Sequence, residues 1–127
     1  MRVLVIDDSR AMLAILRNMM SEIGFEVETE QSGPAGLKRL DGGEAFDLVL
    51  VDWNMPEQSG YEFVCAVRDR PSLGRVKLVM VTTETERERV VEALEAGADE
   101  YVMKPFTKAT LVEKLDLLGL APKEGGS

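Results

Sequence analysis

The sequence has no histidine and only one cysteine among its 127 residues. Without histidine the chain lacks the commonest zinc ligand and the usual general acid–base side chain, and it cannot carry a phosphohistidine. Any phosphate chemistry must therefore draw on a donor outside the chain. The single cysteine, Cys65, cannot form a disulfide within the chain, and its apolar neighbours in YEFVCAVRD predict a buried thiol.

Long apolar runs and an excess of basic residues are also absent. No apolar run approaches the length needed to cross a bilayer, and in MRVLVIDDSR only Val3 to Ile6 precede two acids, which is unlike a secretory signal. We therefore expect no membrane insertion and a cytoplasmic location. The 23 acidic and 15 basic residues give a net charge of −8, which argues against nucleic-acid binding, because such binding depends on lysine and arginine.

Composition and length predict one globular domain. Hydrophobic residues make up 45% of the chain and charged residues 30%, as is typical of soluble domains. A chain of this size buries about two-thirds of its unfolded surface. We expect the domain to span residues 1–120 and the last residues, 121–127, to form a flexible tail.

Apolar runs alternate with segments of helical spacing. The continuous runs 3–6, 48–51, 78–81 and 101–103 predict parallel strands covered on both faces, and the alternating FEVETE from Phe25 predicts a strand near an edge. In the first helical segment the apolar stripe is Met12, Ile15, Leu16, Met19 and Ile23, and Gly24 ends it. Five strand–helix alternations predict an α/β fold, a doubly wound (βα)5 arrangement with helices on both faces of a five-stranded parallel sheet.

Polar side chains follow four of these strands: Asp7 and Asp8 after the first, Asp52 and Asn54 after the third, Thr82 and Thr83 after the fourth, and Lys104 after the fifth. Because the carboxyl ends of parallel strands meet at one edge of a sheet, we expect these groups to converge. Three close aspartates repel one another, and Mg²⁺ would relieve that repulsion. One carboxylate could then attack a phosphoryl group, with Lys104 and Thr82 binding the phosphoryl oxygens.

Each of these residues has an ordinary explanation when it is taken alone. The acids after the first strand could cap a helix, Thr82 could do the same, and Lys104 could be a solvated surface lysine. Four such coincidences at the ends of four strands would be needed, so the arrangement as a whole indicates a phosphoryl-transfer site.

Four segments carry a resemblance to a known family: VLVIDDS, LVLVDWNMPEQSGYE, VMVTTE and GADEYVMKPF. Together they resemble the receiver domain of bacterial two-component response regulators, from about Arg2 to Leu118, and they are most similar to its chemotaxis members. The resemblance implies a flavodoxin-like fold with strand order 2-1-3-4-5. It also implies that Asp52 is the phosphoacceptor. The implied Mg²⁺ site has Asp8 as a direct ligand and Asp7 as a ligand mainly through water, together with Asp52 and the backbone carbonyl of Asn54.

Further roles follow from the resemblance alone. It implies that Thr82 and Lys104 hold the phosphoryl group, that Tyr101 is the switch aromatic, and that the Lys104–Pro105 bond is cis. The residues implied to tune the lifetime of the phosphorylated state are Asn54, Thr83 and Glu84. The residues implied to face a partner protein are Arg87, Val90, Leu94, Tyr101, Met103 and Lys114.

The leading hypothesis is a single-domain response regulator that acts in chemotaxis or motility signalling. A histidine kinase would phosphorylate Asp52, the domain would catalyse its own phosphoryl transfer and autodephosphorylation, and it would act on a target such as the flagellar motor switch or another signalling protein. We expect a monomer, with a phosphorylation-linked dimer as an alternative.

The same residues are compatible with three related functions: a phosphate shuttle or sink, a receiver fragment of a larger regulator, and a degenerate receiver that only binds partners. Two unrelated classes are disfavoured. A haloacid dehalogenase-type phosphatase does not fit the adjacent acids in DDS, and a flavodoxin does not fit the acidic loop DDSRAM, because its phosphate loop is rich in glycine and hydroxyl groups.

Overall fold

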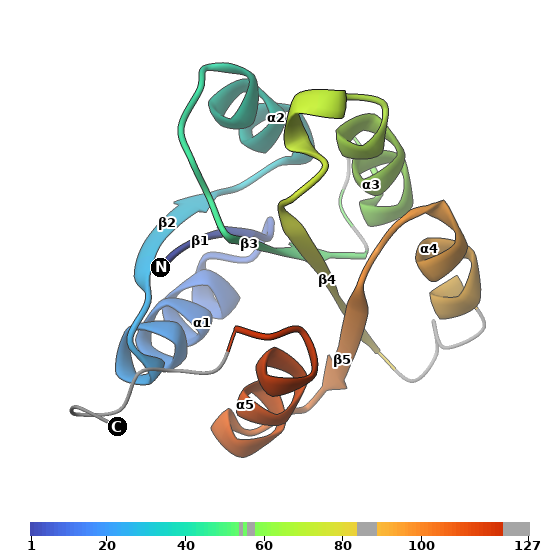
Figure 1. The fold of residues 1–127 in the computed structure, drawn as a ribbon. Coiled ribbons are helices and arrows are strands. Elements are labelled where there is room, and N and C mark those ends of the chain that lie inside the picture. Colours follow the sequence, from blue (N-terminus) through green and yellow to red (C-terminus); the bar gives the residue numbers. More distant parts are fainter. Residues whose placement is uncertain (54, 56–57, 84–88, 121–127) are drawn as a thin grey trace.

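Five parallel strands form one sheet in the order β2-β1-β3-β4-β5, as expected (Figure 1). The computed structural model describes residues 1–53, 55, 58–83 and 89–120. Along the chain the elements are β1 (Arg2–Ile6), α1 (Arg10–Ile23), β2 (Glu26–Glu30), α2 (Gly33–Asp41), β3 (Leu48–Asp52), α3 (Gly60–Arg68), the 3₁₀ helix η1 (Pro71–Leu73), β4 (Lys77–Thr83), α4 (Val90–Ala96), β5 (Glu100–Lys104) and α5 (Lys108–Leu117). Within the described residues, no helix combines the length and apolarity that a membrane span requires.

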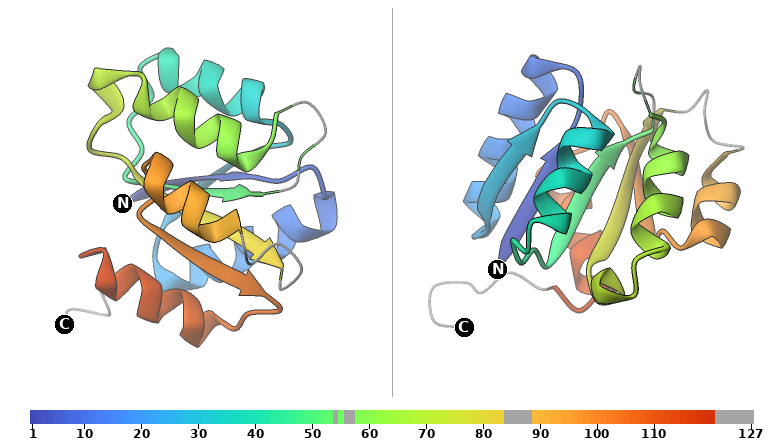
Figure 2. Two further views of the ribbon diagram at one scale, coloured as in Figure 1. Left: turned by 90° about the vertical axis from the view of Figure 1, so that its right-hand side faces the viewer. Right: turned by 90° about the horizontal axis from the view of Figure 1, so that it is seen from above.

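The helices cover both faces of the sheet (Figure 2). Successive strand residues point to opposite faces, so the central strands supply two cores. Val3 and Val5 of β1 pack with α1 and α5, whereas Leu4 and Ile6 pack with α2, α3 and α4. Burial on both faces explains why these strands are continuously apolar rather than alternating.

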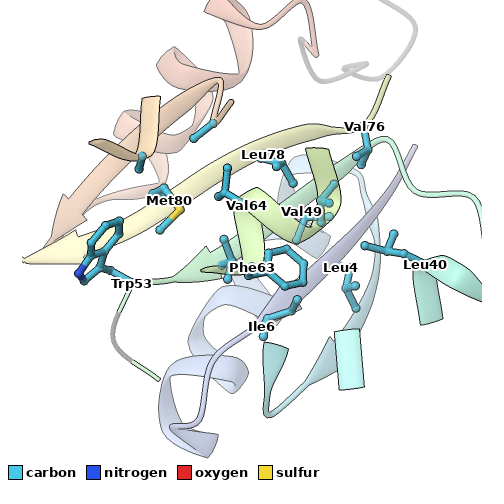
Figure 3. Close-up of a cluster of buried hydrophobic side chains, with 14 of the residues drawn as sticks. Leu4, Ile6, Leu40, Val49, Trp53, Phe63, Val64, Val76, Leu78 and Met80 are labelled. Carbon is cyan, nitrogen blue, oxygen red and sulfur yellow. The ribbon is translucent and has the colours of Figure 1, made fainter. Parts of the chain in front are cut away.

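Phe63 of α3 lies at the centre of the core on the α2–α4 side (Figure 3). It is fully buried and lies over the β1 residues Leu4 and Ile6. Helical spacing with the apolar Val64 and Val67 predicts that Tyr61 faces inward, but Tyr61 is 38% exposed and Phe63 is buried instead. Cys65, expected to be buried, is half-buried on the same helix. The inner face of α3 is thus rotated relative to the prediction.

The buried face of α1 also differs from the expected stripe. The buried residues are Leu13, Leu16, Met20 and Ile23, whereas Ile15 is 46% exposed. Both sets have helical spacing, because apolar residues occupy more than one side of this helix, and spacing alone cannot choose between them. The predicted end is confirmed, since Gly24 has φ 117° and its N–H donates to the carbonyls of Met20 and Ser21.

Hydroxyl side chains fix the starts of four helices. Ser9, Ser32 and Thr107 each accept a hydrogen bond from the backbone N–H three residues later. Ser59 and Glu62 form a reciprocal capping box at α3, so this helix starts immediately after the loop that follows β3.

An ion-pair network covers one face of the edge strand β2. The Arg39 guanidinium of α2 contacts Glu28 at 3.1 Å, Glu30 at 3.2 Å and Glu44 at 2.9 Å. Arg2 of β1 lies 3.3 Å from Glu44 as well. The network joins the edge strand to α2 and to the chain before β3.

Arg68, the last residue of α3, joins η1, the segment before β4 and the turn between α4 and β5. Its guanidinium donates to the carbonyls of Gly97, Leu73 and Val76 at 2.9–3.2 Å, and to the Asp99 carboxylate at 2.9 Å. The same carboxylate accepts the N–H of Leu78 at 2.8 Å. Four bonds in divergent directions require the planar fork of arginine.

We expect Arg68→Lys to lower the free energy of unfolding by about 2 kcal/mol, because lysine cannot satisfy these carbonyls together. Urea denaturation followed by circular dichroism measures the change. Arg75→Lys, at an exposed arginine close by, is the control and should change stability by less than about 0.5 kcal/mol. Equal stability of the two variants would contradict the role given to Arg68.

Candidate functional site

The register of the sheet brings two aspartates together. Ile6 of β1 pairs with Val51 of β3, so the next residues, Asp7 and Asp52, lie side by side at the carboxyl ends of these strands. Asp52 remains part of β3 and pairs with Val81 of β4. Both carboxylates are buried, with exposures of 1% for Asp7 and 6% for Asp52.

Asp8 completes a cluster of three carboxylates. One oxygen from each of Asp7, Asp8 and Asp52 lies within 4.8 Å of the other two. Asp8 is exposed, so the cluster opens to solvent on that side. Oxygen donors of this kind at this spacing suit a hard divalent cation that keeps several waters, as Mg²⁺ does.

Lys104 supplies positive charge to the same cluster. Its ammonium lies 3.4 Å from Asp52 Oδ1 and 3.7 Å from Asp7 Oδ2. β5 brings it there, because Thr83 of β4 pairs with Lys104. The bond from Lys104 to Pro105 is cis, as the resemblance implied. The expected convergence of the acids and the lysine is therefore present.

The environment of Asp7 disfavours the ionised form of its carboxyl group. Burial raises the pKa of Asp7 above its usual value, and the charge of Asp8 adds to this, while the Ser9 N–H and the Lys104 ammonium act in the opposite direction. Asp7 Oδ1 accepts the Ser9 N–H at 2.9 Å, but Oδ2 is buried with no hydrogen-bond partner among the described residues. A metal ion would satisfy that oxygen, so these residues fit the cation that the sequence suggested.

Asp7→Asn is expected to raise the free energy of unfolding of the metal-free protein at pH 7 by about 1 kcal/mol, since it removes a buried charge and keeps the acceptor for Ser9. The raised pKa of Asp7 determines how the stability of the wild-type protein depends on pH. In wild type, the stability associated with this group is fully present below its unfolded pKa and is lost as pH rises through its folded pKa.

The check is thermal denaturation of both proteins in EDTA between pH 3 and pH 8. The gain from Asp7→Asn should disappear at the acid end. In Mg²⁺ the order should reverse, because the variant lacks a ligand oxygen. If the variant were less stable than wild type in EDTA at pH 7, the charge of Asp7 would not destabilise the folded protein.

Thr82 and Tyr101 lie on one face of the sheet. Thr82 pairs with Met103 and Met80 pairs with Tyr101, and paired residues of neighbouring strands share a face. Thr82 is 1% exposed, and its hydroxyl donates to the Thr83 carbonyl at 3.4 Å. Tyr101 is partly buried, and the Lys114 ammonium lies 4.5 Å from its ring centroid.

The residues expected to face a partner protein differ in how far they are exposed to solvent. Val90 is 8% exposed and packs inward from α4, whereas the next residue, Val91, is 58% exposed. This burial differs from the expectation for Val90, which is the first residue of α4. Leu94 is 38% exposed, and Tyr101, Met103 and Lys114 are partly exposed. Asn54, Glu84 and Arg87 lie outside the described residues.

Two contributors to the site were absent from the sequence prediction. The Ser9 N–H binds Asp7, and Gly60 starts α3 directly against β3, where its N–H donates to the Trp53 carbonyl at 2.8 Å. A helix-capping serine two residues after Asp7 and a glycine after Ser59 were the available signals.

The chain belongs to the response regulator receiver domain family, whose profile matches residues 3–116. Members of this family are the phosphoacceptor domains of two-component signalling. Among similar proteins, chemotaxis protein CheY-3 of Vibrio cholerae is 39% identical over 117 residues, which cover 91% of this chain and 89% of that protein. Chemotaxis protein CheY1 of Helicobacter pylori is 37% identical over 119 residues, covering 93% of this chain and 96% of that protein.

Solved structures show the same likeness. The chemotaxis response regulator CheY4 of Vibrio cholerae superposes with a TM-score of 0.84 at 34% identity, covering 92% of this chain and 97% of that one. A CheY-like receiver domain protein from Methanospirillum hungatei superposes with a TM-score of 0.80 at 36% identity, covering 92% of this chain and 91% of that one. The fold is therefore the CheY-like flavodoxin fold.

Proposed function

We propose that this receiver accepts a phosphoryl group from a histidine kinase on Asp52, with Mg²⁺ bound by Asp7, Asp8 and Asp52, and thereby changes its affinity for a downstream protein. One observation carries the proposal: three carboxylates lie within 4.8 Å of one another, and a lysine ammonium lies 3.4 Å from Asp52. The chemotaxis names of the relatives support a role in chemotaxis or motility, with the flagellar motor switch as one target.

In the proposed reaction, an oxygen of Asp52 attacks the phosphorus of a phosphohistidine on the kinase. The new O–P bond forms as the P–N bond breaks, and the imidazole leaves with the electron pair. Lys104 neutralises the incoming phosphoryl oxygens and Thr82 donates a hydrogen bond to one of them. Asp7, Asp8 and Asp52 would hold the Mg²⁺, whose charge would offset the negative charge of the carboxylates and of the phosphoryl group.

The return reaction would be hydrolysis by water, which releases phosphate and regenerates the Asp52 carboxylate. The residues proposed to set its rate are Asn54, Thr83 and Glu84. Thr82 would move toward the phosphoryl group and Tyr101 would turn inward, so that phosphorylation shifts a two-state equilibrium. The output would be altered protein contact by a monomeric cytoplasmic domain, residues 1–120.

Intact mass after incubation with Mg²⁺ and acetyl phosphate tests this function. We expect wild type to gain the mass of one phosphoryl group, and Asp52→Asn to gain none because an amide is not a nucleophile at this site. EDTA should also abolish the gain in wild type. Phosphorylation of Asp52→Asn to the wild-type extent would place the acceptor elsewhere and overturn the proposal.

A further inference from the structure

The strand β5 is an edge strand of the sheet, and α4 and α5 lie on opposite sides of it (Figure 1). Tyr101 of β5 pairs with Met80, which faces the core on the α2–α4 side, so the Tyr101 side chain leaves the strand toward that side. Lys114 belongs to α5, whose buried residues Leu111 and Leu115 pack into the other core. The side chains of Tyr101 and Lys114 therefore start on opposite faces of the sheet.

The Tyr101 ring and the Lys114 ammonium nevertheless meet. The ammonium lies 4.5 Å from the centroid of the ring. Because the strands separate the two faces, a lysine of α5 can reach this ring only around the open edge of β5. The ring therefore lies over that edge, and Tyr101 is accordingly only partly buried.

Glu100, the residue before Tyr101, fixes the Lys114 side chain at this edge. The Lys114 ammonium donates to Glu100 Oε1 at 3.1 Å, and the same oxygen accepts the backbone N–H of Tyr101 at 3.1 Å. The side chains of Lys114 and Glu100 are 23% and 19% exposed, so solvent screens this ion pair less than a fully exposed one. Lys114 is thus bound by one residue of β5 while it contacts the ring of the next.

These contacts stabilise one position of the Tyr101 ring. A lysine ammonium is attracted to a tyrosine ring when it lies within about 6 Å of the ring centroid, and this attraction is lost when the ring turns into the core. Interactions that are made in only one of two states shift the equilibrium toward that state. Lys114 and Glu100 therefore favour the state in which the ring lies over the edge of β5.

We propose that Lys114 and Glu100 are positioning residues for Tyr101, which hold its ring over the edge of β5 and thereby oppose the phosphorylated state of Asp52. The hold on the ring follows from the contacts. Its effect on Asp52 rests on the proposed function, in which Tyr101 turns inward as Asp52 is phosphorylated. Phosphorylation then has to break the contact between Lys114 and the ring, and loss of that contact has to favour the phosphorylated state.

NMR spectra of protein with ¹³C-labelled tyrosine rings and threonine methyl groups, recorded in Mg²⁺ with and without beryllofluoride, test the hold on the ring. Beryllofluoride is a stable substitute for the phosphoryl group. The chain has two tyrosines, so Tyr61→Phe assigns the remaining ring signal to Tyr101. Without beryllofluoride, we expect Lys114→Met to move the Tyr101 ring signal and the Thr82 methyl signal toward their beryllofluoride positions. Thr82 is on the face of the sheet opposite α5, so its signal reports the equilibrium rather than the lost ammonium.

Three further variants separate the hold on the ring from a general effect of charge. Glu100→Gln should move both signals in the same direction as Lys114→Met, because the ammonium loses its ionic partner. Lys114→Arg keeps a cation that can contact the ring and Glu100, and should leave both signals at their wild-type positions. Lys108→Met removes an exposed ammonium from the same helix and should also leave them unchanged. Unmoved signals in Lys114→Met, equal movement in Lys108→Met, or movement away from the beryllofluoride positions would overturn the proposal.

The rate of phosphorylation by acetyl phosphate, followed by intact mass, tests the link to Asp52. We expect Lys114→Met to react about threefold faster than wild type and Lys114→Arg to react at the wild-type rate. A variant that merely loosened the fold would not gain rate, so an equal or slower reaction of Lys114→Met overturns the link. If neither beryllofluoride nor acetyl phosphate acts on wild type, the proposed function fails and the link with it. The Tyr101 ring signals of Lys114→Met and Lys108→Met then still decide whether Lys114 holds the ring.

Discussion

Lys104→Met is expected to lower the free energy of unfolding of the metal-free protein by about 2 kcal/mol and to slow phosphorylation of Asp52 about 100-fold. The ammonium lies 3.4 Å from Asp52 and 3.7 Å from Asp7, both of which are buried. Its removal takes away the positive charge that offsets the repulsion between these two carboxylates. The rate falls further than stability alone explains, because the incoming phosphoryl oxygens lose their neutralising charge.

Lys108→Met is the matched control. Lys108 lies four residues further along, at the start of α5, and pairs with Glu22 at 3.7 Å on the exposed surface. Its loss should change stability by less than about 0.5 kcal/mol and leave the phosphorylation rate unchanged. Saturating Mg²⁺ should restore part of the stability of Lys104→Met, because it binds only the folded site. If Asp52 of the Lys104→Met variant were phosphorylated at the wild-type rate, Lys104 would have no part in the reaction.

Gly60→Ala is expected to lower the free energy of unfolding by about 3 kcal/mol and to impair phosphorylation of Asp52. A Cβ at Gly60 would lie 2.8 Å from the Asp52 carbonyl oxygen and 2.9 Å from Trp53 Cα. Both are backbone atoms at the end of β3, which cannot move aside as a flexible side chain would. The methyl group would therefore push α3 away from the strand that carries the acceptor, or displace the acceptor itself.

Gly74→Ala provides the comparison, since Gly74 also has a negative φ and its added Cβ would meet only the Pro71 carbonyl, at 3.3 Å. We expect a change below about 1 kcal/mol and normal phosphorylation. Chemical denaturation of both variants measures the change in stability, and intact mass measures their phosphorylation. A Gly60→Ala protein with wild-type stability would show that α3 is free to shift away from β3.

The strands could be predicted from the sequence because burial on both faces gives short, continuous apolar runs rich in β-branched residues, as is typical of parallel strands. The runs 3–6, 48–51 and 78–81 fall within β1, β3 and β4, and the strand ends then predicted which polar groups meet. The strand order came from resemblance to a family, because right-handed crossovers restrict the order without fixing it. The distances within the carboxylate cluster depend on side-chain rotamers, which a one-dimensional pattern does not contain.

The rotation of each helix about its own axis was harder to predict than the positions of the strands. In α1, Ile15 and Leu13 are both apolar, and only packing against the sheet decides that Leu13 is buried. At the start of α4, Val90 and Val91 are chemically identical, yet one is 8% exposed and the other 58%. The sequence cannot separate such neighbours, because the position of the first helical turn decides between them.

The charged edge strand β2 affects how two molecules of this protein associate at high concentration. An edge strand offers unpaired backbone groups to any other extended chain, and parallel sheets are open to such pairing at their margins. Glu26, Glu28 and Glu30 place three carboxylates along β2, and Arg39 holds two of them in position against α2. A second copy approaching edge to edge would have to separate these side chains from their arginine partners and desolvate them, so the residues that join β2 to α2 also disfavour pairing of two molecules through this edge.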